Sequence, residues 1–548
     1  MDIHELESKI HSMVDDLQGL CSTVGLSNTA NEEVVVTSVF LYKFLNDKFM
    51  YNLGKFSEEI DVPVESILKN EDDMLDAFYE YNSKDVAFSY EDTIQYLINH
   101  IEQQDFYKQF DDALVRISKN VKNEAFAVET ADGEKTDLFE PLTVMVESAQ
   151  RNNFAKAIFG IIAKDKFDFS EAFGGSFDFY SAIFEYLIKD YNTAGGGKYA
   201  EYYTPHAIAT IMARLLVGDH PDLHSMECYD PSAGTGTLLM ALSHQIGENR
   251  CTIFSQDISQ RSNKMLKLNL LLNGLVSSLD NAIQGDTLVN PYHKSDDGQQ
   301  LRQFDFVVSN PPFKIDFSDT REKIAAMPVR FWAGVPKVPA KKKESMAIYT
   351  CFIQHVINSL KPTGKGAIVI PTGFITSKSG VEKKILQKIV DDKIVYGCVS
   401  MPSNVFANTG TNVSVLFFDK SATVDKVILI DASKLGEEYK DANGLKKVRL
   451  NPAEIDKVVT TFQQKQAVED FSVAVSYDEI KEKGYSLSAG QYFEIKIDYV
   501  DITEEEFNRR MEEYKQTLAK QFDESHRLES EIMKQLDALH FNPIKANE

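Results

Sequence analysis

The sequence has 548 residues, 43% of them hydrophobic, which is too long for one ordinary core and apolar enough to fold into two or three domains. Its five cysteines include no CxxC pair and no apolar run approaches twenty residues, which argues against a disulfide framework, a metal site built on cysteines, secretion and membrane insertion, and favours the cytoplasm. The formal net charge of −25 argues against a protein that grips duplex DNA unaided, although such acidity also simply keeps a large cytosolic protein soluble.

The first part of the chain, residues 1–190, is predicted to be an all-helical N-terminal domain. It is poor in glycine and proline, and its apolar residues recur at helical spacing, as at Phe40 and Phe44. The run NTAGGGK at 192–198 then breaks the pattern with three consecutive glycines, a composition typical of a loop or hinge. We therefore expect the first domain boundary there.

The middle of the chain, residues 191–500, is predicted to be an α/β domain. Short β-branched segments alternate with helical ones from MECYDP at 226–231 to GAIVIP at 366–371. Such alternation builds a parallel sheet with helices on both faces, a Rossmann-like doubly wound sheet. Further strands are expected at VSVLFF, residues 413–418, and KVILI, residues 426–430.

The end of the chain, residues 501–548, is predicted to be a strongly charged helical tail. Its apolar residues recur at alternating spacings of four and three, at Phe507, Met511, Tyr514 and Leu518. One face of this helix must be buried, either on its own chain or against a partner as a coiled-coil-like arm.

A glycine turn in the middle region predicts a cofactor pocket. The segment YDPSAGTGT, residues 229–237, ends a strand and opens a helix, and its two glycines let the backbone turn tightly and approach a ligand. Asp230 at the strand end can hold a charged amino group. The dinucleotide pattern GxGxxG fails because Leu239 occupies its third glycine, and no GxxxxGK[ST] loop occurs, so NAD and nucleoside triphosphates are disfavoured.

Two further acids follow strand-like segments. Asp257 ends CTIFSQD, at the position where a carboxylate in such sheets accepts both ribose hydroxyls, and Asp286 in QGDTL is placed to read an adenine ring from the side. A single acid of this kind is more often a helix cap. Three of them at successive strand ends behind a glycine turn favour a nucleoside-containing cofactor.

The predicted strand FDFVVS runs into a candidate catalytic tetrapeptide, Asn310, Pro311, Pro312 and Phe313. The prolines lock the backbone, so the Pro311 carbonyl is held rigidly and the Asn310 side chain presents a second acceptor beside it. Two such oxygens suit a planar exocyclic amine, whose lone pair becomes nucleophilic when both N–H groups are held. Phe313 would offer a stacking face. The alternative is that these residues form an ordinary Pro-Pro turn after a strand. The position of the tetrapeptide after the glycine turn in a doubly wound sheet argues against this alternative.

These motifs resemble a known family. DPSAGTG at 230–236 followed by SNPPF at 309–313 is similar to the amino-methyltransferases, and AEYYTP at 200–205 resembles the modification subunits of type I restriction-modification systems. The resemblance implies a site-specific DNA methyltransferase that moves a methyl group from S-adenosylmethionine to N6 of a flipped adenine, without a metal. In such subunits the tyrosine-threonine-proline turn closes over the cofactor. The motifs and the resemblance together give the cofactor-binding set Glu201, Tyr202, Tyr203, Thr204, Pro205, His206, Asp230, Pro231, Gly234, Thr235, Gly236, Thr237, Asp257 and Asp286.

The resemblance also implies partners. It predicts a complex on double-stranded DNA with a DNA-specificity subunit, usually two modification subunits to one, and optionally with a restriction subunit. A more basic partner would reconcile the acidic chain with a DNA substrate. The insertion at 314–343 is either a solvated charged loop or a holder of phosphates near the flipped base. The insertion contains Trp332, and its basic residues, the candidate phosphate contacts, are Arg321, Arg330, Lys337, Lys341, Lys342 and Lys343.

Two alternative functions stay open at this point. A glutamine or guanine amino-methyltransferase would use a similar NPPF site, although such enzymes rarely combine a large helical N-terminal domain with the YTP turn. A non-catalytic assembly subunit would bind the cofactor only structurally, and the intact Asn310 and Phe313 argue against it.

Overall fold

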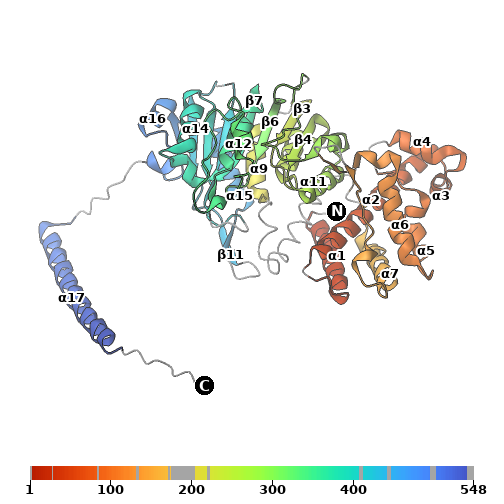
Figure 1. The fold of residues 1–548 in the computed structure, drawn as a ribbon, viewed down its shortest axis with the longest axis horizontal. Coiled ribbons are helices and arrows are strands. Elements are labelled where there is room, and N and C mark those ends of the chain that lie inside the picture. The colour runs from red at the N-terminus through yellow and green to blue at the C-terminus, as the bar shows by residue number, and fades with distance from the viewer. Residues whose placement is uncertain are drawn as a thin grey trace. The chain divides into compact units, whose positions relative to one another are not determined.

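The structure, a computed structural model, falls into two compact units, residues 1–493 and residues 494–548 (Figure 1). The glycine-rich run at 192–198, expected as a domain boundary, lies outside the residues that it describes. Among the described helices, none combines the length and the apolar character needed to cross a membrane. The described residues are 3–27, 29–82, 86–126, 128–130, 135–170, 173, 204–218, 222–295, 297–406, 411–421, 423–440, 446–493 and 502–539.

The described part of the N-terminal region is mostly helical, as predicted. Its helices are α1 (Ile3–Thr23), α2 (Ala30–Ile60), α3 (Val64–Leu68), α4 (Met74–Tyr81), α5 (Ile94–Asn99), α6 (Phe106–Lys119) and α7 (Arg151–Ile162). Helix α2 begins where the Thr29 hydroxyl accepts a hydrogen bond from the Glu32 amide at 3.2 Å. The core between the helices is aromatic, with Tyr42, Phe110 and Phe159 fully buried against one another.

Two short strands are an addition to this helical region. Strand β1 (Val128–Thr130) pairs antiparallel with β2 (Lys135–Thr136) and parallel with β5 (Ala282–Gln284). The N-terminal region therefore extends the central sheet. Strands of three and two residues are too short to show a period of two in the sequence.

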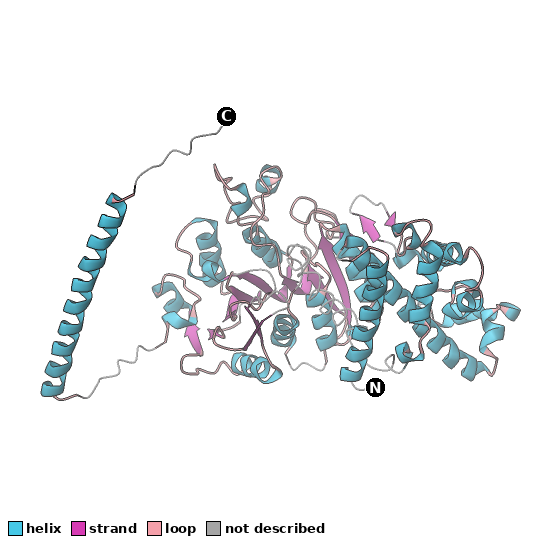
Figure 2. Ribbon diagram, turned by 90° about the horizontal axis from the view of Figure 1, so that it is seen from below, coloured by secondary structure: helices cyan, strands magenta, loops and turns pink. Residues whose placement is uncertain are grey.

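Among the described residues, the central sheet has eleven strands in the order β13-β10-β8-β9-β7-β6-β3-β4-β5-β1-β2. From β3 the chain runs outward through β4 and β5 and then returns to β6 and β7, with β3 to β7 all parallel, so the predicted doubly wound sheet is confirmed. Figure 2 shows the strands of the sheet (magenta) among the helices (cyan). Strand β9 runs antiparallel to both of its neighbours. The remaining bounds are β3 (Met226–Asp230), β4 (Cys251–Asp257), β6 (Phe304–Ser309), β7 (Leu360–Pro371), β8 (Val395–Ser400), β9 (Val413–Asp419), β10 (Lys426–Asp431) and β13 (Ser472–Ser476).

Helices cover both faces of this sheet, and the strand residues alternate between two cores. Cys228 and Ile253 enter one core, while their neighbours Tyr229 and Phe254 enter the other. The first core is closed by α9 (His206–Val217), α10 (Thr237–Ile246), α11 (Gln260–Leu272) and α15 (Pro452–Gln463). The second is closed by α13 (Tyr349–Asn358), α14 (Gly380–Asp391) and α16 (Tyr477–Glu482). Short elements outside these layers are α12 (Arg321–Ala325), β11 (Glu437–Lys440) and β12 (Lys446–Arg449).

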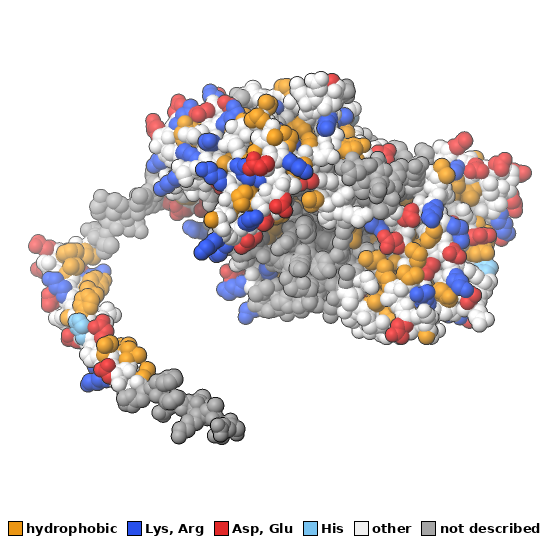
Figure 3. All heavy atoms as spheres, in the orientation of Figure 1, with side chains coloured by type: hydrophobic (Ala, Val, Ile, Leu, Met, Phe, Trp, Pro, Cys, Tyr) orange, Lys and Arg blue, Asp and Glu red, His pale blue; other side chains and the backbone are white. Residues whose placement is uncertain are grey.

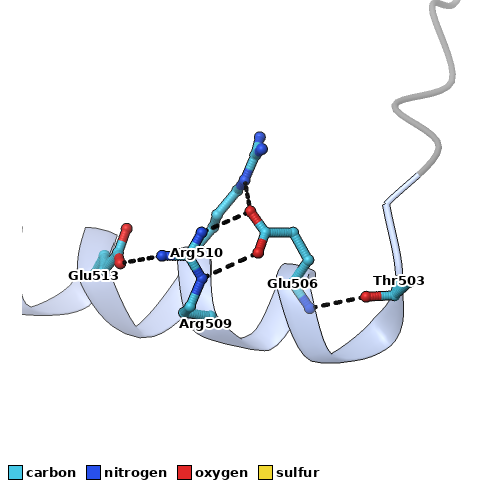
Figure 4. Close-up of polar contacts among 5 residues, drawn as sticks. All are labelled: Thr503, Glu506, Arg509, Arg510 and Glu513. Atoms are coloured by element: carbon cyan, nitrogen blue, oxygen red, sulfur yellow. Dashed lines mark hydrogen bonds and ion pairs between the residues drawn. The ribbon is translucent and has the colours of Figure 1, made fainter.

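In the second unit, residues 502–539 are described, and they contain one helix, α17 (Glu504–Asp537), at the position of the predicted tail. The Thr503 hydroxyl caps it by accepting a hydrogen bond from the Glu506 amide, and the Glu506 carboxylate forms ion pairs with Arg509 and Arg510 (Figure 4). Hydrophobic side chains are exposed along the helix (Figure 3). They are Phe507, Met511, Tyr514, Leu518, Phe522, Leu528, Ile532, Met533 and Leu536.

Candidate active site

The carboxyl ends of β3, β4 and β6 lie side by side at one edge of the sheet. Tyr229 is level with Val307 on β6, and Asp230 is level with Ser255 on β4. Successive strands are added on one side of β3 up to β5 and then on its other side from β6, so the strand order reverses between β3 and β6. Ligands of open α/β sheets bind at such a point. Asp230, Asp257 and Asn310, each at a strand end, are thereby placed at the same edge, as the sequence predicts.

The glycine turn between β3 and α10 depends on two positive backbone angles. Gly234 has φ of +52° and Gly236 has φ of +88°, which side-chain-bearing residues rarely adopt. A Cβ added at Gly236 would also overlap Cδ1 of Leu266 on α11. Thr237 begins α10 and is buried, and the carbonyl of Thr235 accepts a hydrogen bond from Nδ2 of the Asn269 side chain at 3.3 Å. The turn is therefore fixed between β3 and α11.

Asp257 holds this turn closed. One carboxylate oxygen accepts the Gly234 amide at 2.8 Å and the other accepts the Ser259 amide, also at 2.8 Å. Burial raises the pKa of its carboxyl above the ordinary value. Each oxygen keeps a further lone pair, so the predicted contacts with ribose hydroxyls are chemically compatible with this arrangement. Ile258, which directly follows, has 66% of its surface exposed, and the sequence prediction missed this apolar side chain.

Asp230 is fully buried and connects the turn to β6. Its carboxylate accepts the Ser232 amide at 2.9 Å, and the Ser232 and Ser309 hydroxyls lie 2.7 Å apart. Burial raises the pKa of Asp230 to about 8, with a smaller contribution from nearby Asp257. A buried carboxyl of this kind fits a cationic ligand group, because a positive charge beside it would restore the ionised form. The Asp230 carboxyl thus suits the positively charged amino group of S-adenosylmethionine.

Replacing Asp230 with asparagine is expected to stabilise the unliganded protein at neutral pH. The pKa of this carboxyl rises from near 3.8 unfolded to about 8 folded, so its contribution to stability is full below pH 4 and is lost as the pH rises to 8. The asparagine variant lacks this loss. Thermal unfolding should be measured from pH 4 to 9. The melting temperature of the variant minus that of the wild type should increase as the pH rises to 8. Parallel curves would contradict the expectation, and S-adenosylmethionine should shift the variant less than the wild type.

The candidate catalytic tetrapeptide follows β6 directly. Asn310 is half-buried, and its Nδ2 donates a hydrogen bond to the Thr204 hydroxyl at 2.9 Å. Pro311 is buried, Pro312 is exposed, and half-buried Phe313 packs against both cores while part of its ring remains accessible. A partly exposed aromatic ring beside a rigid acceptor is the arrangement that a stacked planar base requires.

The predicted cofactor turn is described only in part. Glu201, Tyr202 and Tyr203 lie outside the described residues. Thr204 is buried, half-buried Pro205 caps α9, and exposed His206 is its first residue. The structure therefore brings the threonine of this turn to Asn310, the asparagine of the candidate catalytic tetrapeptide.

The loop after β5 carries Asp286, which caps its own turn. The carboxylate accepts the Leu288 amide at 2.9 Å and the Val289 amide at 3.1 Å. The neighbouring Thr287 hydroxyl donates to the buried Pro231 carbonyl at 2.7 Å. Asp286 is thus held near the glycine turn, and its predicted contact with an adenine ring stays a prediction.

The insertion at 314–343 is packed against the rest of the protein, so it is not merely a solvated charged loop. Phe317, Ile324 and Phe331 enter the second core. Arg330, a candidate phosphate contact, is instead buried, and its guanidinium donates to the carbonyls of Thr287 and Leu288 and to Nδ1 of His355. Arg321, another candidate, donates to the Pro336 carbonyl at 2.9 Å within the insertion. Arg330 thus supplies hydrogen-bond donors to two buried residues, Thr287 and Leu288.

The other basic residues of the insertion remain available to a ligand. Lys337, Lys341, Lys342 and Lys343 are exposed. The Ile315 amide donates to the Met346 carbonyl at 3.2 Å, which brings the end of the insertion back to the residues after Phe313. Trp332 is half-buried, and its ring lies 5.4 Å from the Lys388 ammonium. The exposed lysines are thus the candidates that still fit a phosphate-binding role.

Two curated proteins resemble this chain over about two thirds of its length. The type I restriction enzyme MpnII methylase subunit of Mycoplasma pneumoniae is 26% identical over 355 residues, 64% of this chain and 63% of that protein. The type I restriction enzyme MjaIX methylase subunit of Methanocaldococcus jannaschii is 29% identical over 381 residues, 66% of this chain and 64% of that protein. The matches thus span less than two thirds of the length of these relatives.

A solved structure and a family model extend this likeness. The crystal structure of the type I restriction-modification methyltransferase subunit from Streptococcus thermophilus has a TM-score of 0.69 at 20% identity, over 89% of this chain and 100% of that one, which shows the same fold. The model of the family described as N-6 DNA methylase matches residues 175–516, more than half of the 548 residues. The predicted resemblance is therefore confirmed, and the chain belongs to the N-6 DNA methylase family.

Proposed function

We propose that this chain is the modification subunit of a type I restriction-modification system, a site-specific DNA methyltransferase that methylates adenine at N6. The observation that carries the proposal is the link between the two motifs. The Asp230 carboxylate accepts a hydrogen bond from the Ser232 amide. The Ser232 hydroxyl is hydrogen-bonded to the hydroxyl of Ser309, the residue before Asn310. A cofactor held at Asp230 and an amine held at Asn310 would therefore lie at adjoining strand ends.

The proposed cofactor is S-adenosylmethionine, which supplies an electrophilic methyl group on its sulfonium when bound. Asp230 would hold its amino group and Asp257 its ribose hydroxyls, while the glycine turn allows close approach of the backbone. The loop of Asp286 and the exposed Ile258 would flank the adenine ring. The turn at 201–206 would close over the pocket.

The acceptor chemistry would be carried by the tetrapeptide. Asn310 Oδ1 and the Pro311 carbonyl would accept the two N6 hydrogens of a flipped adenine and so favour a pyramidal, nucleophilic nitrogen. The same two oxygens would stabilise the positive charge that develops on N6. Phe313 would stack on the base, and the exposed lysines Lys341 to Lys343 would contact neighbouring phosphates.

The proposed domain roles follow the sequence boundaries. Residues 191–500 would carry catalysis, residues 1–190 would form the helical N-terminal domain, and residues 501–548 would serve assembly. The exposed apolar face of α17 supports the last role, because a helix with such a face is stable only when another surface covers it. The proposed partners are a specificity subunit, with two modification subunits to one, a restriction subunit and double-stranded DNA in the cytoplasm.

The isolated chain is expected to bind duplex DNA weakly and to methylate it site-specifically only with a specificity subunit. Its net charge of −25 opposes phosphate binding, so the partner must supply the basic surface. Electrophoretic shift assays with and without the specificity subunit would measure this. Tight, site-specific binding by the chain alone would overturn it. A variant truncated after residue 501 should no longer assemble with the specificity subunit. If it still assembles, only the role proposed for α17 is wrong.

The reaction itself is tested by tritiated methyl transfer from S-adenosylmethionine, followed by digestion of the product. Label on N6 of adenine in DNA supports the proposal. Label on a protein glutamine or on guanine would instead establish the alternative amino-methyltransferase function, and cofactor binding without any transfer would establish an assembly subunit.

A further inference from the structure

The one side-chain hydrogen bond described for Asn310 is to a residue 106 positions earlier in the chain. Asn310 Nδ2 donates to Thr204 Oγ1 at 2.9 Å. Thr204 itself is 5% exposed, so water competes little for this bond. The contact therefore joins the tyrosine-threonine-proline turn to the catalytic tetrapeptide rather than to the cofactor pocket alone.

The position of the Thr204 hydroxyl is fixed by α9. The carbonyl of Pro205 accepts the amides of Ile208 and Ala209 at 3.0 and 3.1 Å, which starts the helix directly after Thr204. Ile208 and Ala209 are fully buried in the first core. The hydroxyl is thus held in place by core packing, while the backbone before Asn310 is held by the Ser309–Ser232 contact.

The two ends of a primary amide, its oxygen and its NH2 group, are similar in size and differ in how they form hydrogen bonds. Its oxygen accepts hydrogen bonds and its nitrogen donates them, and a half-turn about the last bond of asparagine exchanges the two. An adenine N6 amine needs an acceptor, so only the rotamer with Oδ1 toward the base is productive. With Nδ2 bound to Thr204, Oδ1 is the atom left for the base.

We infer that Thr204 is a positioning residue for methyl transfer, whose hydroxyl holds the Asn310 amide in the orientation that presents Oδ1 to the target amine. This inference rests on the proposed function. It differs from the role implied by the family resemblance, in which the turn closes over the cofactor. It predicts a defect in turnover rather than in cofactor affinity.

The test compares Thr204→Val, which keeps the shape and removes the hydroxyl, with Thr204→Ser, which keeps the hydroxyl. In the complex with the specificity subunit, kcat for methylation of site-bearing DNA should fall roughly tenfold to a hundredfold in the valine variant. The serine variant should recover most of this loss. The Kd for S-adenosylmethionine, measured by calorimetry, should stay within about twofold of the wild type in both.

A second background separates orientation from general damage. Asn310→Asp replaces the amide with a carboxylate whose two oxygens both accept, so no orientation has to be chosen. Thr204→Val should therefore cost much less kcat in the Asn310→Asp enzyme than in the wild type.

Either of two results would overturn the inference. One is a weaker Kd for S-adenosylmethionine with unchanged kcat in Thr204→Val, which would place the hydroxyl on the cofactor. The other is an equal loss in the valine and serine variants, which would make the role one of packing. Failure of the wild-type complex to bind the cofactor or to label adenine would instead refute the proposed function.

Discussion

Asn310→Ala is expected to abolish methyl transfer while leaving the affinity for S-adenosylmethionine nearly unchanged. The variant removes one of the two acceptors proposed for the target amine, an interaction that strengthens as charge develops on N6, so the loss should be on the order of a hundredfold to a thousandfold or more. The proposed cofactor contacts are at other strand ends, at Asp230 and Asp257. Tritiated methyl transfer by the assembled complex measures turnover, and calorimetry measures cofactor affinity.

Phe313 gives the contrast within the same tetrapeptide. Phe313→Ala should weaken engagement of the flipped base by roughly 1–3 kcal/mol of stacking without removing an acceptor, and Phe313→Trp should be tolerated. Robust transfer by the Asn310→Ala complex, or label on cytosine or protein, would refute the proposed mechanism.

Gly236→Val is expected to eliminate measurable binding of S-adenosylmethionine. The new side chain meets two obstacles at once, a φ of +88° and overlap with Leu266, so the turn must move away from the pocket or α11 must shift. The variant should also unfold at a lower temperature. Calorimetric titration with the cofactor and thermal unfolding are the two measurements.

Gly274→Val is the matched control for this prediction. Gly274 also has a positive φ, +73°, but a Cβ there meets no atom within 4 Å. Backbone strain alone should cost this variant about 1–2 kcal/mol of stability and leave cofactor affinity intact. Equal loss of binding in both variants would show that general destabilisation, and not the shape of the glycine turn, controls the pocket.

The parts of the site that the sequence predicts are those carried by contiguous residues. The glycine turn at 230–237, the acid at the end of β4 and the tetrapeptide at 310–313 are local patterns, and the doubly wound sheet places them without further information. The structure thus confirms where these segments lie, and their contacts with cofactor and base remain predictions.

The contacts that the sequence could not reveal are between distant residues. Arg330 reads as one more basic residue of a charged insertion, and only the packing of that insertion brings it to the carbonyls of Thr287 and Leu288. The hydrogen bond between Thr204 and Asn310 likewise depends on the residues just before α9 meeting the residues just after β6 in the folded chain. Charge and motif spacing carry no signal for either contact.

The pairing of β1 with β5 also covers backbone groups of β5 that would otherwise be unpaired. An unpaired edge of a parallel sheet presents free amides and carbonyls that can recruit a strand from another molecule. Here the N-terminal region covers β5 with β1 and finishes the sheet with β2, a strand of only two residues. A catalytic region cut free of residues 1–190 would expose β5 as an edge, so aggregation rather than misfolding is the hazard that such a truncation introduces.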